Sequence, residues 1–416
     1  MASSADIPQS GTLPPPITER GIVGWAHANL FSTWYNTVLT FVFAAILVLA
    51  LWFGLGWILL EADWKVVATL GGRSMIGQYN TEFACAGQNC FWRPQVSLLL
   101  VSALLGMAWA VSRDKVAGRI AIGAAVLSAA FALLPYSMEQ VGLDVRLLLV
   151  ANLPAVAAGW ALARYTPLGS VRWIVILGVL AFLVTLVLLR GLPGVPGLQP
   201  VPVIYWGGLM LNLLLAVTGI ALSLPIGIAL ALGRRSHLPV VKLLCVVFIE
   251  VFRGVPLITL LFMSQVLVPL AFPEDFPANS LFRAGVVITL FSSAYMAENI
   301  RGGLQALHPG QAEAARALGL PGWQTTMLIS LPQAIRNVIP AIVGQFIALF
   351  KDTTLVYIIG MLDVLEFGRA FIQGNPEYLT DTPEFLLFIA LVFWIICYTM
   401  SYASRRVEEH LQVGQR

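Results

Sequence analysis

A few ionisable side chains that could do chemistry interrupt long apolar stretches of this sequence. Glu250 and Arg253 lie three residues apart in EVFRGVPLITL, so on a helix they share a face and can neutralise each other. Gly254 and Pro256 follow directly and interrupt the helical hydrogen bonds. Two interpretations stay open: a salt bridge at the end of a kinked helix, which is favoured for the segment taken alone, or a discontinuous helix beside a substrate path.

A second polar group lies in GQFIALFKDTTL, where Gln345, Lys351, Asp352 and Thr353 accompany an apolar run. Neighbouring residues on a helix do not face each other, so Lys351 and Asp352 do not form one simple ion pair. These side chains either end a helix, with the lysine reaching a polar surface, or line a cavity. The apolar run YIIGML continues after them, which favours the cavity.

The third group is EAARALGLPGWQTTMLISLP, which begins at Glu313. Pro309 can occupy the first turn of a helix there, because its missing N–H is not needed at that position. Ala312, Ala315 and Gly319 share one side of that helix and give a smooth face that another backbone can approach closely. The alternative is an amphipathic helix on a membrane surface, but the small face favours docking into a protein groove. After the helix come its terminators, Gly319 and Pro321, and an apolar edge of Trp323, Met327 and Leu328.

Patterns that mark an enzyme are absent from the sequence. It contains no GxxxxGK[ST] loop for ATP, no HExxH, no Gly-x-Ser-x-Gly, and only four histidines. Cys85 and Cys90, in CAGQNC, are two thiols with no histidine nearby, so they cannot complete a zinc site. They are either free thiols or, if their loop faces an oxidising compartment, a small disulfide, which is modestly favoured. We predict no catalytic residue, no metal and no cofactor bound by this chain.

The composition places these groups in an integral membrane protein. Of 416 residues, 58% are hydrophobic and 11% charged, and the mean hydropathy is +0.84. Soluble domains are usually about 25% charged. The net charge of +3 is too small to suggest a nucleic-acid partner. The first 19 residues lack Lys, Arg and an apolar run, so we expect a disordered cytoplasmic tail rather than a signal peptide.

Apolar runs of about 20 residues predict an all-α fold with about ten transmembrane helices. The Gly- and Pro-rich stretch 191–203 divides them into two sets of five. Ionisable residues such as Glu298 concentrate in the second set, which is therefore expected to be the functional part. The expected regions are a tail over 1–35, an accessory membrane region over 36–190 with a loop at 61–95, and a core over 204–406. The predicted spans lie near 36–60, 96–112, 119–136, 147–163, 172–189, 206–232, 241–268, 281–300, 337–360 and 384–403.

Lys and Arg in alternate short loops predict the orientation. Cationic residues gather around 113–119, 164–172, 234–242, 301–336 and 405–416, and such loops are usually cytoplasmic. Both termini are then cytoplasmic, and the loop 61–95 with CAGQNC lies on the opposite side.

These motifs resemble a known family. EAARALG followed by Leu331 and Pro332 resembles the EAA loop of permease subunits in ABC importers, here over 301–336. EVFRGVPL, AYMAENIRGGLQAL (294–307) and FKDTTL resemble segments of the polar amino-acid permeases, and WGGLMLNLLLA (206–216) resembles their first core helix, with Asn212 where Thr is commoner. The N-terminal addition resembles the larger permease of bacterial general L-amino-acid importers, in the inner membrane.

The resemblance implies a role for each group. It implies a type I importer core of five helices and a coupling helix that docks onto a separate ATPase and contains Glu313, Ala314, Ala315, Arg316, Gly319 and Leu320. It implies a substrate pathway bordered by Gln345, Lys351, Asp352, Thr353 and Glu298. Glu250, Arg253, Gly254 and Pro256 are expected to be structural. The implied partners are a second homologous permease, an ATPase dimer that binds ATP and magnesium, a periplasmic amino-acid-binding protein and lipid.

The leading hypothesis is the translocation subunit of an ATP-driven L-amino-acid importer. Gln345 stands where permeases for basic amino acids often have an acidic residue, so a broad or neutral and acidic range is expected. The alternative is an ion-coupled secondary transporter that uses Glu250, Glu298 or Asp352, although no inverted repeat is visible in the sequence. A third possibility is a membrane scaffold, in which the first five spans would be the main functional part.

Overall fold

The computed structural model describes residues 21–80, 90–133, 143–271 and 279–411. These residues form helices and connecting loops, and the one β-type pairing among them is an isolated bridge between Gly208 and Asp363. The backbone divides into two compact units, Met1–Asp63 and Trp64–Arg416. The all-α prediction is confirmed for the described part of the chain.

The first unit contains one long apolar helix and a shorter helix before it. These are α1 (Gly21–Leu30) and α2 (Trp34–Gly56), and α2 continues into a π-helical turn, η2 (Trp57–Glu61). Thr33 caps α2 by accepting a hydrogen bond from the Asn36 N–H, a common way to satisfy the first turn. The region expected to be a tail over 1–35 therefore includes a helix, while residues 1–20 lie outside the described residues.

The second unit begins with the helices that precede the 191–203 linker. Two short helices follow the first unit directly, and longer apolar helices then cross the region predicted as accessory. They are α3 (Lys65–Leu70), α4 (Arg73–Ile76), η3 (Gly77–Asn80), α5 (Trp92–Ser112), α6 (Lys115–Leu133), α7 (Leu143–Val150), α8 (Asn152–Tyr165) and α9 (Val171–Arg190).

The helices after the linker complete the second unit. Long helices alternate there with short turns and 3-10 or π-helical segments. They are η4 (Val203–Tyr205), α10 (Gly208–Arg234), α11 (Pro239–Gly254), α12 (Leu257–Ala271), α13 (Ser280–Gln305), α14 (Pro309–Ala317), α15 (Gly322–Gln324), η5 (Thr325–Ser330), α16 (Leu331–Asn337), α17 (Ile339–Asp352), η6 (Thr353–Ile359), α18 (Val364–Gly374), η7 (Pro376–Tyr378) and α19 (Thr382–Leu411).

Most predicted spans correspond to helices of membrane-spanning length. Among the described residues, 8 helices are long and apolar enough to cross a bilayer, and a bent pair raises the number to 9. That pair is α11 and α12, which meet at an angle of 105°. The predicted span 147–163 instead falls on α7 and α8, of 8 and 14 residues. Pro154 explains the break, because a proline ring clashes with the carbonyl four residues before it.

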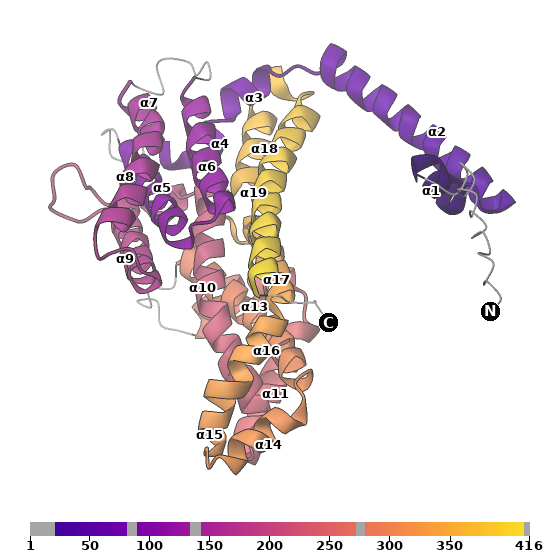
Figure 1. Ribbon diagram of the computed structural model, residues 1–416. Helices are drawn as coiled ribbons and strands as arrows, with labels where there is room; N and C mark the ends of the chain where they lie inside the picture. The colour runs from indigo at the N-terminus through magenta and orange to yellow at the C-terminus, as the bar shows by residue number, and fades with distance from the viewer. Residues whose placement is uncertain (1–20, 81–89, 134–142, 272–278, 412–416) are drawn as a thin grey trace, which may run out of the picture. The chain divides into compact units, whose positions relative to one another are not determined.

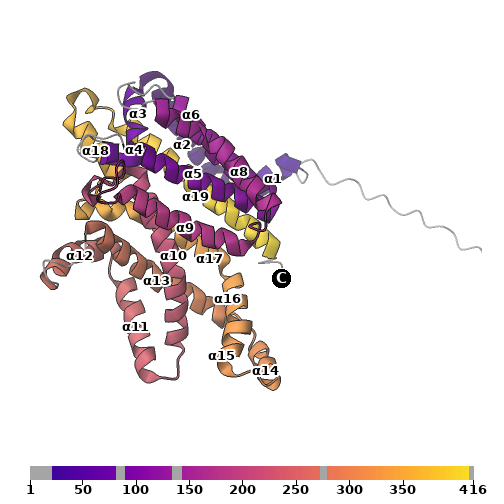
Figure 2. The same ribbon diagram turned by 90° about the vertical axis from the view of Figure 1, so that its left-hand side faces the viewer.

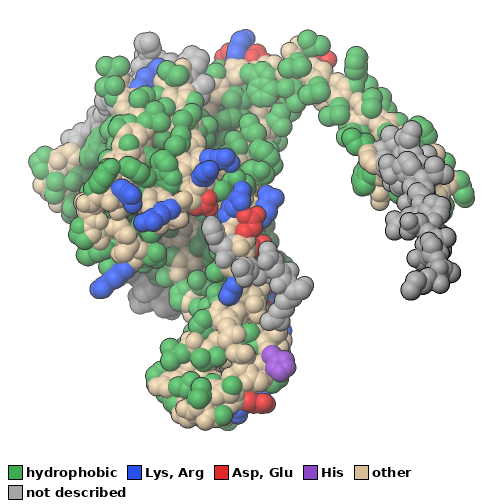
Figure 3. Space-filling view, viewed as in Figure 1, with side chains coloured by type: hydrophobic (Ala, Val, Ile, Leu, Met, Phe, Trp, Pro, Cys, Tyr) green, Lys and Arg blue, Asp and Glu red, His purple; other side chains and the backbone are tan. Residues whose placement is uncertain are grey.

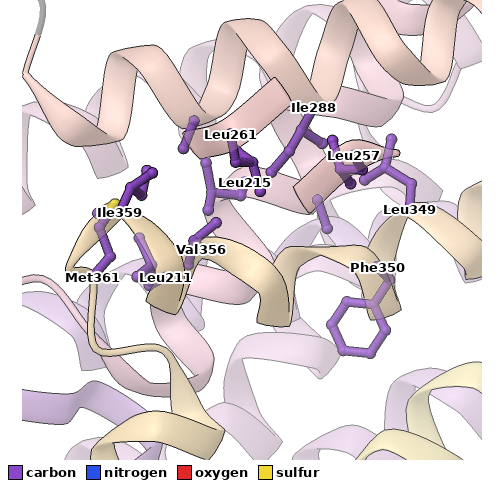
Figure 4. Close-up of a cluster of buried hydrophobic side chains, with 12 residues drawn as sticks. Leu211, Leu215, Leu257, Leu261, Ile288, Leu349, Phe350, Val356, Ile359 and Met361 are labelled. Carbon is purple, nitrogen blue, oxygen red and sulfur yellow. The ribbon is translucent and has the colours of Figure 1, made fainter. Parts of the chain in front are cut away.

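Apolar side chains from five elements form the centre of the second unit. Leu211 and Leu215 from α10 meet Leu257 from α12, Ile288 from α13 and Leu349 from α17, with residues of η6 closing the cluster. Figure 4 shows these side chains pointing toward one another between the helices. This cluster holds α17, which carries Gln345, Lys351 and Asp352, against α10, α12 and α13.

The helices before the linker pack on one another through glycines. A Cβ at Gly106 of α5 would lie 2.1 Å from the Val156 carbonyl oxygen of α8, and one at Gly159 of α8 would lie 1.9 Å from the Ala103 carbonyl oxygen. Such close backbone approach is typical of membrane helix pairs. Buried Asn152 adds polar contacts, since it accepts a 2.6 Å hydrogen bond from Ser102 and donates one of 3.0 Å to Ser128.

A buried arginine fixes the linker between the two sets of helices. The Arg93 guanidinium of α5 donates to the carbonyl oxygens of Gln199 at 2.9 Å and Gly197 at 3.0 Å. Tyr79 donates to the Leu189 carbonyl oxygen at 2.8 Å. Burial raises the pKa of Tyr79 to about 12, although Arg93 beside it acts in the opposite direction. The linker 191–203 is therefore anchored to the helices on its N-terminal side.

The region before the linker also contacts the core directly. A Cβ at Gly77 would lie 2.6 Å from the backbone of Gly207 and Gly208, and Gly77 and Gly208 both have positive φ angles. Only glycine allows this approach without strain. Residues 65–190 thus belong to the same compact unit as 204–411.

The second unit has two distinct ends. Figures 1 and 2 show α3 and α18 at one end and α14 and α15 at the other. In the space-filling view, hydrophobic side chains cover most of the face formed by α5–α9, and Lys and Arg side chains gather near its middle (Figure 3). The segment that joins α13 to α16 contains α14 and α15, so it projects from the end opposite α18.

Candidate functional site

The segment from Pro309 to Ser330 forms a compact projection, here called the α14–η5 segment. Pro309 occupies the first turn of α14, and the His308 side chain accepts a hydrogen bond from the Gly310 N–H. At the other end Gly319 has a φ of +79°, and the Leu320 N–H donates to the Ala315 carbonyl oxygen at 3.1 Å. This is how helices commonly end at glycine. The helix start and stop predicted from the sequence are confirmed.

The outward face of the α14–η5 segment differs from the predicted one. Glu313, Ala314 and Arg316 are exposed, but Ala315 is buried, and α14 packs against η5. The prediction that Ala315 belongs to an exposed small face is therefore wrong. Gly319 reverses the chain direction, so η5 packs back on α14, and a methyl group is small enough to fit beneath it.

Exposed apolar side chains accompany these polar residues. Leu318, Trp323 and Leu328 are 83%, 67% and 63% exposed, and Met327 is exposed as well. An apolar group of this kind beside charged residues is typical of a protein contact. The apolar edge predicted from Trp323, Met327 and Leu328 is confirmed as exposed.

Five charged residues from three helices meet near the ends of α10, α11 and α13, and we call them the charge cluster. At its centre lies Glu298 of α13, whose side chain is 15% exposed. Its carboxylate accepts hydrogen bonds from Arg234 of α10 at 2.9 Å and from Arg301 at 2.8 to 3.1 Å. Arg253 of α11 lies 3.5 Å from it, and Glu250 pairs with Arg234 at 3.0 Å.

This arrangement corrects two predictions. Glu250 and Arg253 do not pair with each other; each reaches a residue on a neighbouring helix. Glu298, expected on the substrate pathway, has its carboxylate occupied by three arginines. The contacts with α10 cross between helices, so the sequence spacing on one helix could not reveal them. Gly254 and Pro256 do mark a discontinuity, since the chain bends there by 105°.

The second polar group of the sequence, Gln345, Lys351, Asp352 and Thr353, is divided between exposed and buried positions. Lys351 is exposed, and Gln345 and Asp352 are partly buried. Thr353 is completely buried; its hydroxyl donates to the Phe350 carbonyl oxygen at 2.6 Å. Thr353 therefore cannot border a cavity, contrary to the prediction, because its side chain points into the packed core. Gln345, Lys351 and Asp352 remain available to a pathway along α17.

A buried polar network, the Asn212 lock, holds the residues directly after Asp352. Asn212 of α10 donates to the Thr353 hydroxyl at 3.0 Å and to the Asp363 carboxylate at 3.3 Å. Its own carbonyl oxygen accepts from the Val364 N–H at 3.1 Å. Asn212, Thr353 and Asp363 are all completely buried. The lock joins α10 to both η6 and α18.

Asp363 also caps α18. Its carboxylate accepts hydrogen bonds from the backbone N–H of Glu366 at 3.0 Å and of Leu365 at 3.3 Å. Burial raises the pKa of Asp363, and these hydrogen bonds oppose that shift without cancelling it. The sequence analysis missed this residue, although Asp363 followed three residues later by Glu366 is a recognisable helix-start pattern.

The cysteine and metal predictions concern different parts of the chain. Cys85 lies outside the described residues, so its pairing with Cys90 stays a prediction. Cys245 and Cys397 are free. Among the residues that the structure describes, no group of three or more His, Cys, Asp or Glu side chains is placed to hold a metal.

Comparison with known proteins relates the region around these sites to transporters. The family described as binding-protein-dependent transport system inner membrane component matches residues 223–413. The chain is 51% identical over 210 residues to the inner membrane amino-acid ABC transporter permease protein YhdY of Escherichia coli, covering 50% of this chain and 57% of that protein. It is 45% identical over 211 residues to the glutamate/glutamine/aspartate/asparagine transport system permease protein BztC of Rhodobacter capsulatus, covering 51% and 49%. The chain thus spans about half the length of these two relatives.

Shorter relatives are covered more completely. The glutamate transport system permease protein GluD of Corynebacterium glutamicum is 35% identical over 211 residues, with 50% of this chain and 75% of that protein covered. A solved structure of an amino acid ABC transporter with histidines has 29% identity and a TM-score of 0.43, over 48% of this chain and 91% of that one. The predicted resemblance is confirmed: the chain is a multi-span membrane protein that belongs to the family of binding-protein-dependent transport system inner membrane components, the permeases of ABC transporters.

Proposed function

We propose that this chain is a translocation subunit of an ATP-driven, binding-protein-dependent importer of L-amino acids. The observation that carries the proposal is the 51% identity over 210 residues with an amino-acid permease. The similar protein of Rhodobacter capsulatus is named for glutamate, glutamine, aspartate and asparagine, which supports a neutral and acidic or broad range. No observation favours the ion-coupled alternative.

The α14–η5 segment is the proposed contact with the ATPase. It projects from one end of the second unit (Figure 2), and it presents Glu313, Ala314, Arg316 and Leu318 outward. Gly319 and Leu320 shape the end of its helix. Since the sequence has no P-loop, ATP and magnesium would bind to the partner ATPase, and this chain would transmit its motion without catalysis.

The substrate pathway is proposed to run along α17. Gln345, Lys351 and Asp352 are accessible there, and an ammonium beside a carboxylate complements the two charged groups that every α-amino acid carries. Gln345 adds no charge, so this position supplies no carboxylate for a cationic side chain. The Asn212 lock would hold Lys351 and Asp352 at fixed positions along the pathway.

The remaining partners follow from this role. We infer a second homologous permease, an ATPase dimer and a periplasmic amino-acid-binding protein, with the complex in the bacterial inner membrane. Both termini would be cytoplasmic, which places the α14–η5 segment on the ATPase side. The helices of residues 36–190 would be accessory to the core over 204–406.

The test is co-purification with the tagged full-length chain, followed by ATPase assays with the binding protein. The panel contains L-glutamate, L-glutamine, L-aspartate, L-asparagine, L-arginine and L-histidine. We expect stimulation by the acidic and amide amino acids. Glu313→Lys should abolish the stimulation without preventing assembly, whereas Glu377→Lys, at an exposed site on η7, should leave it unchanged. Failure of every amino acid to stimulate the wild-type complex would contradict the proposal.

A further inference from the structure

The charge cluster lies directly beside the helix end that leads into the α14–η5 segment. Glu298 and Arg301 are on the last turns of α13, which ends at Gln305, and α14 begins at Pro309. Arg301 donates a 2.8 Å hydrogen bond to the Gln305 side chain. A displacement of α14 therefore reaches the cluster through less than three turns of helix.

The Glu298 carboxylate joins three helices through one group. It contacts Arg234 at the last residue of α10 and Arg253 near the end of α11, besides Arg301 on its own helix. Arg253 also lies over the Tyr295 ring at 5.6 Å, so α11 has a second cationic contact with α13. The cluster contains three arginines and two glutamates, and Glu298 is the acid that pairs with all three arginines.

The other end of the α14–η5 segment is tied to the same helix. A Cβ at Gly303 of α13 would lie 2.5 Å from the Ala334 carbonyl oxygen of α16, so the two backbones are in contact. Ile249, Met296 and Ile300 pack with Leu331 and Ala334 in one apolar cluster. The helices that enter and leave the segment thus form one packed body next to the charge cluster.

We propose that Glu298 is a positioning residue that transmits the displacement of the α14–η5 segment from α13 to α10 and α11. The proposal rests on the proposed function. From α11 the motion would pass the 105° bend to α12, whose Leu257 and Leu261 pack in the core cluster with Leu349 of α17. Glu298 would thereby connect the ATPase contact with the pathway without touching substrate.

Removal of the Glu298 charge should loosen this connection and leave each helix folded. Glu298→Gln keeps the size of the side chain, but Glu250, which pairs with Arg234, would then be the one acid left in the cluster. Like charges at this spacing repel one another. The ATPase could still move α14, while α10 and α11 would follow less closely.

The experiment measures amino acid taken up per ATP hydrolysed, using the co-purified complex in lipid vesicles with labelled L-glutamate and L-glutamine. Glu298→Gln should keep the stimulated ATPase rate and reduce uptake per ATP about tenfold, a typical size for coupling between sites. Glu298→Asp should restore part of the loss. Glu366→Gln, which removes a partly exposed ion pair with Arg369 on α18, should have no effect.

A second variant provides the test if Glu298→Gln does not assemble into the complex. Arg253→Gln removes the longest contact of Glu298 together with the contact between Arg253 and the Tyr295 ring. We expect the same kind of loss at about fivefold, the low end of the range. An unchanged ratio of uptake to ATP in Glu298→Gln, or in Arg253→Gln if the first variant does not assemble, would overturn the inference. A wild-type complex that transports no amino acid would contradict the proposed function instead.

Discussion

Replacement of Asn212 by leucine should destabilise the core although the two side chains have the same number and branching of heavy atoms. Asn212 is completely buried and makes three hydrogen bonds, to Thr353, Asp363 and Val364. Leucine makes none of them. Thr353 keeps its bond to the Phe350 carbonyl oxygen, so its hydroxyl proton stays satisfied, but the Val364 N–H loses its partner.

The size of the effect follows from these contacts. A neutral hydrogen bond contributes about 0.5–1.5 kcal/mol and one to a charged group about 1.5–3 kcal/mol, and values inside membrane proteins average about 0.6 kcal/mol. The contact with Asp363 is long, at 3.3 Å, so its lower value applies. The expected loss for Asn212→Leu is about 3 kcal/mol. Asn212→Thr should cost about 1 kcal/mol, because its hydroxyl can both donate and accept.

The assay is the free energy of unfolding of the purified chain in mixed micelles. Asn299→Leu is the matched control, since Asn299 makes one 3.4 Å hydrogen bond, to the Ala341 carbonyl oxygen, near the protein surface. It should change stability by less than about 0.5 kcal/mol. If Asn212→Leu were as stable as the wild type, or no less stable than Asn299→Leu, the reasoning about the lock would be refuted.

Three further changes test other contacts in the same unfolding assay. Gly159→Ala should cost about 1–3 kcal/mol because the new Cβ would clash with the backbone of α5. Gly178→Ala is the control, since a Cβ there would have no atom within 4 Å, and it should be neutral or stabilising. Equal effects of the two changes would contradict the packing argument. Arg93→Met should cost about 2 kcal/mol and make the linker 191–203 more sensitive to protease, and an unchanged cleavage rate would count against its anchoring role. Asp363 has a raised pKa in the folded state, so its contribution to the free energy of unfolding should fall as pH rises from its ordinary pKa through the folded value. Asp363→Asn should remove this pH dependence of stability. If the variant and the wild type had the same pH profile, the raised pKa of Asp363 would be refuted.

The sequence predicted the helices well because long apolar runs and helix terminators act locally. Pro309 and Gly319 set the limits of α14 on their own, and the discontinuity at Gly254 and Pro256 appears as the 105° bend. The break between α7 and α8 was missed because Pro154 lies within an otherwise continuous apolar run. Composition and motifs were also sufficient to identify the family, which the relatives confirm.

The site was predicted less completely because its contacts join distant parts of the chain. The spacing of Glu250 and Arg253 suggested a pair within one helix, whereas the actual partners come from α10 and α13. Thr353 adjoins Asp352 in sequence, but a 3-10 turn begins there and turns its side chain into the core. Which residue of a polar run faces the core depends on packing, and periodicity alone does not determine it.

The most direct test of the account is uptake of labelled L-glutamate into vesicles that contain the purified complex. ATP is enclosed with the ATPase, the binding protein is supplied on the opposite side, and no ion gradient is present. We predict uptake that requires both ATP and the binding protein and that Glu313→Lys abolishes. Uptake that proceeds without ATP and the binding protein, or uptake into vesicles that hold this chain alone once a proton or sodium gradient is imposed, would contradict the central claim.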